Sequence, residues 1–233
     1  MRRVVTIDGP AGAGKSTVAR RLATRLGWRF LDTGAMYRAV TLAALRSGTD
    51  LTSDAELGAL VATLEVALRD EAVLLDGQDV TRAIRRVEVT QASKFVADSP
   101  SVRRRLTDWQ RALALEQDIV TEGRDQGTLV FPNAFRKYYL TASDEERAGR
   151  RLADYQERGE SVSFEAVLRD QRLRDARDAA RSIAPMVPAD DALVIDSTGM
   201  SIDSVVERLV ADIGEHLGDS VNGLGTGGGI PRE

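Results

Sequence analysis

A glycine-rich segment near the N-terminus has the residue types and spacing of a phosphate-binding loop. It fits the pattern G-x-x-x-x-G-K-S/T and reads Gly9, Pro10, Ala11, Gly12, Ala13, Gly14, Lys15, Ser16 and then Thr17. Four residues between the glycines let backbone N–H groups surround a phosphate, and glycine tolerates the positive φ that this requires. The lysine then reaches the outer phosphates, and the Ser16 hydroxyl is a ligand for Mg²⁺. The segment predicts binding of a nucleoside triphosphate such as ATP with Mg²⁺.

Arginine and aspartate residues in two further segments are suited to a second anion. Residues 31–38 read LDTGAMYR and residues 122–128 read EGRDQGT, and each follows an apolar run typical of a strand. Open α/β sheets bind ligands at the carboxyl ends of their strands, so we expect Arg38, Arg124 and Asp125 beside the phosphate loop. Alone, each segment could be a capped helix start or a surface ion pair. Next to a phosphate loop, the two together predict a second phosphate site.

Two stretches with helical periodicity carry arginines one turn apart. Spacings of three and four residues place on one face of each helix Arg147, Arg150 and Arg151, and then Arg174, Asp178 and Arg181. A solvated mixed-charge face has the same pattern. Beside a donor phosphate, an arginine-bearing lid would instead exclude water and stabilise the charge of the transferring group. If the pattern is a lid, binding of both nucleotides should protect these helices from hydrogen exchange.

Short apolar runs alternate with longer helical periods, which is the pattern of a parallel sheet with crossover helices. Five runs are predicted as core strands, at residues 4–8, 28–31, 118–121, 137–140 and 192–195. Helices are predicted at residues 15–26, 35–45, 100–116, 144–158, 164–181 and 201–217. Residues 64–85 break the rhythm around Asp76-Gly77, which predicts a small antiparallel insert. The glycine-rich residues 218–233 have little to pack, so we expect a disordered tail that can be removed without loss of activity or stability.

Composition limits the class of protein. The chain has 233 residues, 42% hydrophobic and 29% charged, which is enough apolar material for one substantial core. With 32 basic and 36 acidic residues the formal charge is −4, which argues against a nucleic-acid partner. There is no cysteine and a single histidine, so thiolate and His-rich metal sites are excluded. The first apolar run ends at Asp8, too short for a signal peptide or membrane span, and we expect a cytoplasmic protein without a membrane partner.

Signatures of other nucleotide-binding proteins are missing from the sequence. The only lysines are Lys15, Lys94 and Lys137, and none lies in the Asn/Thr-Lys-x-Asp stretch of a base-reading GTPase. No aliphatic run ends in Asp-Glu, and no Ser-Gly-Gly-Gln segment occurs, as motor or transporter ATPases would require. A kinase acting on a small molecule is favoured, with a non-catalytic nucleotide switch as the alternative. The phosphate loop alone leaves the acceptor open among nucleoside monophosphates, shikimate and sugar acids.

Taken in order, the motifs resemble those of the bacterial cytidylate kinases, a family of phosphate-loop nucleoside monophosphate kinases. The matching residues are 6–17, 31–38, 122–125, 127–128, 130–132, 174–175, 177–178, 181, 184–185 and 195–198, within a span of 4–213. The resemblance implies transfer from ATP, with Mg²⁺, to CMP or dCMP in pyrimidine metabolism, by a monomer. It implies a phosphate-loop NTPase fold, α/β, whose five-stranded parallel core with helices on both faces comprises residues 1–33, 117–143 and 183–217. A monophosphate-binding part would be residues 34–116 and a lid residues 144–182. One departure is Gln126, where an apolar residue is usual.

The resemblance also implies roles for single residues. The matching positions are Arg38, Arg124 and Arg181 for the acceptor phosphate, Arg174 and Asp178 for the sugar, Thr33, Ser93, Arg103 and Asp125 for the cytosine, and Arg150 for the lid near the donor. Catalysis would rest on Lys15, Arg124, Arg150 and Arg181.

The hydrogen-bonding edges of the bases support the cytosine assignment. Asp125 can only accept and suits the cytosine amine, whereas Arg103 can only donate and suits N3 or O2; uracil presents the opposite edge. We therefore expect a preference for CMP and dCMP over UMP. Replacing Asp125 by alanine should lower kcat/KM for CMP more than for UMP.

The chemistry of such a transfer agrees with the residues present. The nucleophile is a phosphate oxygen, which is largely ionised near pH 7 because its second pKa is about 6. No general base is needed, which fits a chain whose one histidine, His216, lies in the last predicted helix. Alignment of the phosphates and charge neutralisation by Mg²⁺, Lys15 and the lid arginines would supply the catalysis. We expect the Lys15 ammonium to be exposed, so that Lys15→Met costs little stability.

Overall fold

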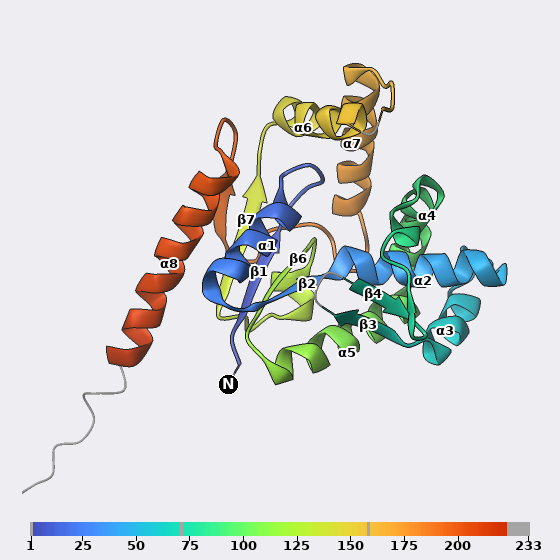
Figure 1. Ribbon diagram of the computed structural model, residues 1–233, viewed down its shortest axis with the longest axis horizontal. Coiled ribbons are helices and arrows are strands. Elements are labelled where there is room, and N and C mark those ends of the chain that lie inside the picture. Colours follow the sequence, from blue (N-terminus) through green and yellow to red (C-terminus); the bar gives the residue numbers. More distant parts are fainter. Residues whose placement is uncertain (1, 70–71, 158, 223–233) are drawn as a thin grey trace, which may run out of the picture.

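The computed structural model describes residues 2–69, 72–157 and 159–222, and its centre is a sheet of five parallel strands (Figure 1). The strand order is β2-β6-β1-β7-β8. Their bounds are β1 Val4–Asp8, β2 Arg29–Asp32, β6 Ile119–Gly123, β7 Arg136–Thr141 and β8 Leu193–Asp196. The five predicted strands are confirmed: β1 has the predicted bounds, and the ends of the other four differ by one or two residues.

The register of the sheet brings the functional loops to one edge. Asp8 at the end of β1 pairs with Gly123 of β6, and Asp32 at the end of β2 pairs with Glu122. The segments that follow these three strands therefore start side by side. This is the edge at which parallel sheets bind ligands, because the strand order reverses beside β1.

Helices cover both faces of the sheet, as a parallel sheet requires. On one face, α1 Lys15–Leu26 and α8 Ile202–Asn222 pack on a cluster that includes Ile7, Leu22 and Leu140. On the other, α2 Thr33–Ser47 and α5 Pro100–Glu116 pack on a cluster that includes Leu31 and Met36. Strands β1 and β6 are buried almost throughout, which explains why both begin with adjacent apolar residues and do not alternate apolar with polar ones.

The segment between α2 and α5 forms a separate lobe. It holds α3 Asp54–Thr63, the strands β3 Val66–Arg69, β4 Ala72–Leu75 and β5 Gln78–Asp79, a 3₁₀ turn η1 Ala83–Arg85, and α4 Val87–Asp98. The three strands form an antiparallel sheet, which confirms the predicted insert. The hairpin turns at Asp76-Gly77, where both φ angles are positive, at 49° and 78°.

The sequence analysis missed α3 and α4. In α3, Ser53 caps the helix by accepting from the Glu56 N–H, but few side chains of the helix are buried and Gly58 lies in its middle. In α4, no side chain caps the first turn, and β-branched residues such as Val87 and Thr90 lower the helix propensity. Both helices are stabilised by packing against neighbouring helices, α3 against α5 and α4 against α2.

Two helices, α6 Asp144–Glu157 and α7 Phe164–Ala179, stand above the edge of the sheet (Figure 1). At the other end of the chain α8 continues to Asn222, so the expected disorder is wrong for residues 218–222. Leu217, at the predicted end of the helix, packs against the core. Residues 223–233 of the expected tail lie outside the described residues. No described helix is long and apolar enough to cross a membrane.

Candidate active site

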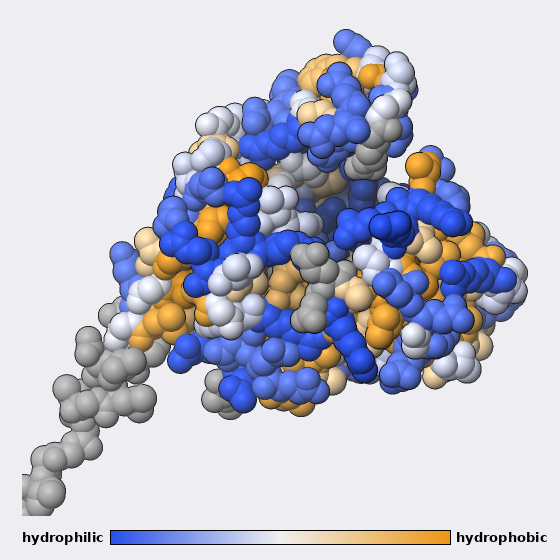
Figure 2. Space-filling model, viewed as in Figure 1, coloured by the Kyte–Doolittle hydropathy of each residue, from blue (hydrophilic) through white to orange (hydrophobic). Residues whose placement is uncertain are grey.

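A cleft of about 1370 Å³ lies between the sheet edge, the α6–α7 pair and the lobe that carries α4. Figure 2 shows the recess, with mostly hydrophilic side chains around its mouth. The predicted site residues that line it are Ala11, Gly12, Gly14, Lys15, Ser16, Thr17, Thr33, Arg38, Ser93, Arg103, Arg124, Asp125, Arg150, Arg174, Asp178 and Arg181. Gly9, Pro10 and Ala13 are not among the lining residues. The fold thus brings all three groups of predicted residues, from the phosphate loop, the strand ends and the lid helices, to one space.

The phosphate loop uses its glycines in two ways. Gly9, Gly12 and Gly14 have φ angles of 142°, 77° and 84°, as the motif predicts. A side chain at Gly9 would also collide with β7, because its Cβ would lie 2.0 Å from the Leu140 carbonyl oxygen. Helix α1 starts at Lys15 with no side-chain cap, so the first N–H groups of the helix are not satisfied by a capping side chain and can bind an anion.

Lys15 is buried rather than exposed, which corrects our expectation. Its side chain is 5% exposed, and Nζ donates to the Pro10 carbonyl oxygen at 2.6 Å. Burial, and then the charge of Arg124, lower the pKa of Lys15 to about 7, against the opposing effect of Glu122. A bound phosphate would restore the full charge by supplying a nearby anion.

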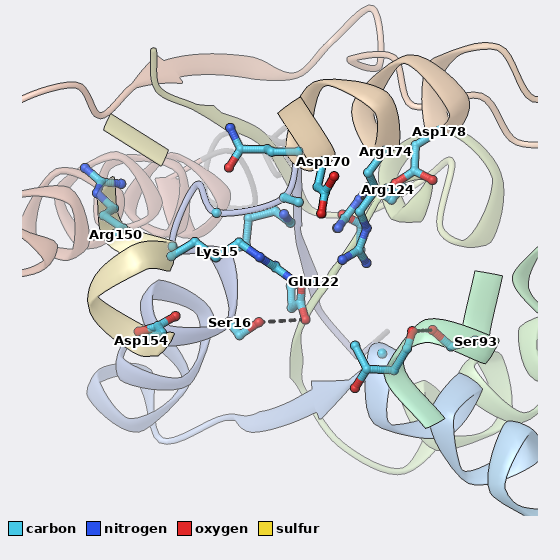
Figure 3. Close-up of a pocket in the computed structure, with 18 of the residues that line it drawn as sticks. Lys15, Ser16, Ser93, Glu122, Arg124, Arg150, Asp154, Asp170, Arg174 and Asp178 are labelled. Carbon is cyan, nitrogen blue, oxygen red and sulfur yellow. Dashed lines mark hydrogen bonds and ion pairs between the residues drawn. The ribbon is translucent and has the colours of Figure 1, made fainter. Parts of the chain in front are cut away.

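Glu122, to which sequence reasoning gave no role, faces Ser16 across the cleft floor. Ser16 Oγ donates to Glu122 Oε1 at 2.9 Å (Figure 3). The described residues contain no group of three or more His, Cys, Asp or Glu side chains placed to hold a metal. A hydroxyl and a carboxylate are nevertheless the hard oxygen ligands that suit Mg²⁺, which usually takes one or two protein oxygens together with substrate phosphates. The signal in the sequence was an acidic residue at the carboxyl end of the strand next to β1.

Arg103 and Asp125 form a nearly buried ion pair, with exposures of 5% and 6%. Arg103 also donates to the Ala97 carbonyl oxygen at 2.9 Å, and its guanidinium lies 5.8 Å from the centre of the Tyr37 ring. Burial raises the pKa of Tyr37 to about 12, so its hydroxyl stays protonated at neutral pH. Tyr37 lines the cleft and is a second residue that the sequence analysis left without a role.

Asp178 lies at the centre of an arginine cluster and is 2% exposed. Its carboxylate accepts from Arg124 Nε at 3.3 Å and pairs with Arg181 at 2.8 Å and Arg177 at 3.7 Å. Figure 3 shows Arg124 and Arg174 converging near Asp178. Burial and the charge of Arg124 lower the pKa of Arg174 to about 10. The cluster therefore concentrates positive charge beyond what one carboxylate neutralises.

The remaining predicted acceptor-binding residues, Arg38, Thr33 and Ser93, each contact a neighbouring residue of the protein. Arg38 lies 3.6 Å from Asp32, which also caps α2. Thr33 Oγ1 donates to the Glu122 carbonyl oxygen at 2.7 Å, so its oxygen is left to accept. Ser93 Oγ donates to the Thr90 carbonyl oxygen at 2.8 Å. Thr33 and Arg38 lie on α2 and Ser93 on α4, and no local pattern could have joined the two helices.

The turn that carries Arg124 and Asp125 is fixed from behind by Asp8. A single π-turn, Gln126–Val130, follows β6, and the Asp8 carboxylate accepts from the N–H groups of Gln126 at 2.9 Å and Gly127 at 2.7 Å. Burial raises the pKa of Asp8 to about 6, although both hydrogen bonds oppose the shift. The Gln126 side chain accepts from Thr121 Oγ1 at 3.0 Å, so its amide packs inside the turn.

The lid arginines divide into two kinds. Arg150 lines the cleft, donating to the Ser197 carbonyl oxygen at 3.0 Å and to Glu146 at 3.2 Å. Arg147 is 4% exposed, lies behind the phosphate loop and does not line the cleft. The helical spacing correctly placed arginines near the donor loop, but it could not tell which of them face it.

Comparison with known proteins bears on this site. The family model for cytidylate kinase matches residues 5–215. Cytidylate kinases from Aeromonas hydrophila and Shewanella loihica are each 47% identical over 223 residues, 94% of this chain and 97% of theirs. That of Serratia proteamaculans is 48% identical over 209 residues, 88% of this chain and 91% of its own. A solved structure of an uncharacterized protein from Eubacterium ventriosum, 12% identical with a TM-score of 0.53, covers 92% of this chain and 99% of its own, and shows the fold alone.

A five-stranded parallel sheet with a phosphate loop after its central strand, and an arginine cluster facing that loop, defines a phosphate-loop kinase. Within that class the match of family model and relatives covers nearly the whole chain. The chain belongs to the cytidylate kinase family.

Proposed function

We propose that the cleft carries out phosphoryl transfer from ATP to CMP or dCMP, giving ADP and CDP or dCDP, with the phosphate loop as donor half and the arginine cluster as acceptor half. The observation that carries this proposal is the convergence of both anion sites on a single cleft that Lys15 and Arg124 line together. Membership of the cytidylate kinase family supports the reaction, and the cleft contains residues suited to it.

In the donor half, the loop from Gly9 to Thr17 would hold the ATP phosphates through its backbone, and Arg150 would close on them from α6. Lys15 would neutralise charge on the transferring group. The oxygens of Ser16 and Glu122 fit Mg²⁺, which supplies further charge neutralisation on the phosphates when bound. We give this Mg²⁺ site as part of the proposal.

In the acceptor half, Arg38, Arg124 and Arg181 would hold the phosphate of CMP, and Arg174 and Asp178 the sugar. The base would lie against the residues at the far end of the cleft, which are Thr33, Ser93, Arg103 and Asp125. The Asp125 carboxylate accepts from the cytosine amine, and Arg103 donates to N3 or O2. Their mutual ion pair supports this assignment, because it orients both groups before the base arrives.

The transfer itself needs no proton acceptor on the protein. An ionised oxygen of the CMP phosphate forms a bond to the γ-phosphorus of ATP as the bond from that phosphorus to the β–γ bridging oxygen breaks, and ADP leaves. The transition state is loose, so its cost falls mainly through alignment and charge neutralisation. Lys15 and the arginines of the cleft supply both.

The division into core (1–33, 117–143, 183–217), monophosphate-binding part (34–116) and lid (144–182) is part of the same proposal. On family membership we also propose a monomer that works in the cytoplasm with nucleotides as its partners. Size-exclusion chromatography of the pure chain tests the monomer.

A coupled assay of ADP release tests the function. ATP and Mg²⁺ are supplied with and without CMP, and then with dCMP, UMP, AMP or shikimate in its place. We expect release that depends on CMP or dCMP. Binding of ATP without acceptor-dependent release would favour a nucleotide switch, and equal release with another acceptor would refute the assignment of the base site.

A further inference from the structure

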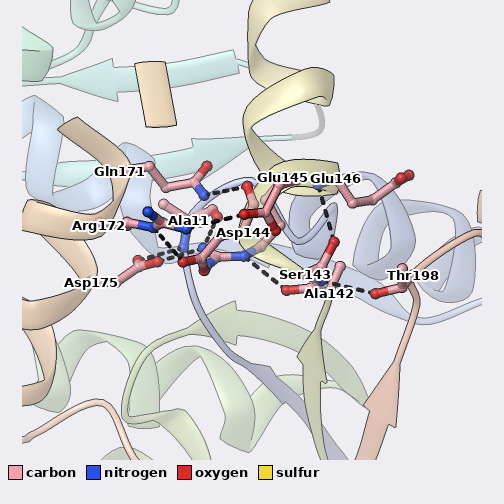
Figure 4. Close-up of polar contacts among 11 residues, drawn as sticks. Ala11, Ala142, Ser143, Asp144, Glu145, Glu146, Gln171, Arg172, Asp175 and Thr198 are labelled. Atoms are coloured by element: carbon pink, nitrogen blue, oxygen red, sulfur yellow. Dashed lines mark hydrogen bonds and ion pairs between the residues drawn. The ribbon is translucent and has the colours of Figure 1, made fainter. Parts of the chain in front are cut away.

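The lid holds the phosphate loop from the side away from the cleft. Asp175 Oδ1, on α7, accepts from the Ala11 N–H at 3.2 Å (Figure 4). An Arg147 Nη, on α6, donates to the Ala11 carbonyl oxygen at 2.8 Å. Arg147 and Asp175 also form an ion pair with each other. One loop residue is therefore bound through both of its backbone polar groups by a charged pair from two lid helices.

Several contacts show that this attachment is tight. Arg147 also donates to the Ala142 carbonyl oxygen at 3.1 Å and pairs with Asp144, so its guanidinium has a fixed place. At the next loop position, a Cβ on Gly12 would lie 2.9 Å from the Arg147 carbonyl oxygen. Neither Arg147 nor Asp175 lines the cleft. The pair therefore acts on the loop and not on the contents of the cleft.

The planarity of the peptide bond carries this contact into the cleft. The peptide group between Pro10 and Ala11 is bound at both ends, by Asp175 at its N–H and by Lys15 Nζ at its carbonyl oxygen. A chain of hydrogen bonds thus runs from the lid to Lys15. In the following peptide group, the carbonyl of Ala11 points back to Arg147, so the trans N–H of Gly12 points the opposite way, toward the cleft.

We propose that Asp175 and Arg147 are positioning residues for the donor-phosphate loop, holding the two peptide groups around Ala11 so that Lys15 and the Gly12 N–H face the ATP phosphates. This rests on the proposed function, because it assigns the donor phosphates to that loop. It also means that the loop is held in its binding conformation only while α6 and α7 are seated on it.

The variant Asp175→Asn tests the proposal, because it preserves size while one N–H donor replaces an acceptor. The new amide group must face either the Ala11 N–H or Arg147 with a donor. We measure Kd for ATP and for CMP by titration calorimetry of the full chain. We expect Kd for ATP to rise by at least about fivefold and Kd for CMP to stay within about twofold. The retained CMP affinity shows that the variant is folded.

Arg172→Gln is the matched control. Arg172 lies on α7, one turn from Asp175, and pairs with Asp144 at 2.7 Å and Glu145 at 3.1 Å on α6. Like Asp175, it joins the two lid helices, but it has no contact with the loop. We expect Kd for ATP within about twofold of the parent. An equal loss of ATP affinity in both variants would mean that only the joining of the helices matters, and would overturn the proposal.

Hydrogen exchange at the Ala11 amide reports directly on its contact with Asp175, and the Arg172→Gln control shows how far a weaker lid alone changes it. Exchange should speed up about tenfold or more in Asp175→Asn and stay unchanged in Arg172→Gln. Unchanged ATP affinity in Asp175→Asn, or equal weakening of ATP and CMP, would also overturn the proposal. Lack of CMP-dependent ADP release by the parent would instead refute the proposed function, while the ATP affinities still decide the role of Asp175.

Discussion

The donor and acceptor halves of the cleft are built in different ways. The donor half is centred on one continuous stretch of nine residues, whose backbone presents N–H groups and whose turns need three glycines with positive φ. The acceptor half collects side chains from α2, α4, α5, α7 and the turn after β6. The donor loop takes its shape from local backbone geometry and is held in place by α6 and α7, whereas the acceptor half depends on tertiary packing for every side chain.

The two halves also differ in how their charge is held before a substrate binds. In the loop, the Ala11 N–H donates to the Asp175 carboxylate, but Asp175 does not line the cleft, so a phosphate need not displace it. The acceptor arginines do pair with carboxylates that a phosphate must displace: Arg124 and Arg181 share Asp178, and Arg181 also pairs with Asp98 at 2.7 Å. Affinity for the donor should thus follow loop geometry. Affinity for the acceptor should depend on how much stronger the ion pairs of the arginines with the CMP phosphate are than those with Asp178 and Asp98, which they replace. Five predictions test this contrast.

Lys15→Met should have the largest effect. The variant loses the one ammonium of the donor loop, and we expect kcat to fall by about 100-fold or more, from a loss of about 3 kcal/mol of transition-state stabilisation. Steady-state rates with saturating ATP and CMP measure this. Turnover within about tenfold of the parent would contradict the role of Lys15.

The same variant tests what burial of Lys15 costs the fold. Since burial lowers the pKa of Lys15 from 10.5 to about 7, the unfolded chain binds more protons between these values. The parent should therefore gain stability as the pH rises from about 7 toward 10.5, and Lys15→Met should lack this gain. We expect the variant to unfold at no lower temperature than the parent at pH 7. A clear drop there would mean that the Pro10 contact stabilises the fold.

Arg181→Met comes next and should act on the acceptor alone. Loss of a charged hydrogen-bond donor costs about 1.5–3 kcal/mol, so KM for CMP should rise about 10- to 150-fold while KM for ATP changes little. Arg177→Met is the matched control, because Arg177 lies near the end of α7, just before Arg181, and pairs with the same Asp178 at the longer distance of 3.7 Å. Equal effects of the two would show that total charge, and not the geometry at Arg181, binds the phosphate.

This contrast explains which features the sequence could predict. The donor loop, five strands and the antiparallel insert depend on local patterns, and the structure confirms them. The burial of Lys15 and the ion pair of Arg103 with Asp125 depend on residues far apart in the chain, which no local pattern contains. Helix α4 was missed for the same reason, because packing of the lobe stabilises it despite weak propensity.

The resemblance to a known family identified the acceptor-binding residues but not the side chains with which they pair. It matched Asp178 to the sugar and Arg181 to the phosphate, but nothing in the sequence predicts that these two side chains pair with each other. It also gave no role to Glu122, Tyr37 or Asp8, whose contributions depend on contacts across the sheet edge.

Asp125→Asn tests the choice of base. The alanine variant would leave Arg103 buried without its partner, at a cost of about 3–5 kcal/mol, so asparagine is the better substitution. An amide can donate to uracil O4, which the carboxylate cannot. We expect the ratio of kcat/KM for CMP to that for UMP to fall by about tenfold. An equal fall for both substrates would show that Asp125 holds the turn or Arg103, and does not contact the base.

Asp98→Asn should give the smallest effect and the most direct view of competition in the acceptor half. Asp98 is 45% exposed and pairs with Arg181, and exposed ion pairs contribute about 0.2–1 kcal/mol. If the CMP phosphate must displace this carboxylate, its removal should lower KM for CMP by about 1.4- to 5-fold and leave KM for ATP unchanged. Asp203→Asn is the control, since Asp203 is an exposed aspartate paired with Arg21 outside the cleft and should change neither value. A rise in KM for CMP in Asp98→Asn would mean that Asp98 orients Arg181 for the phosphate. The acceptor half would then be preorganised like the donor loop, and the contrast between the two halves would fail.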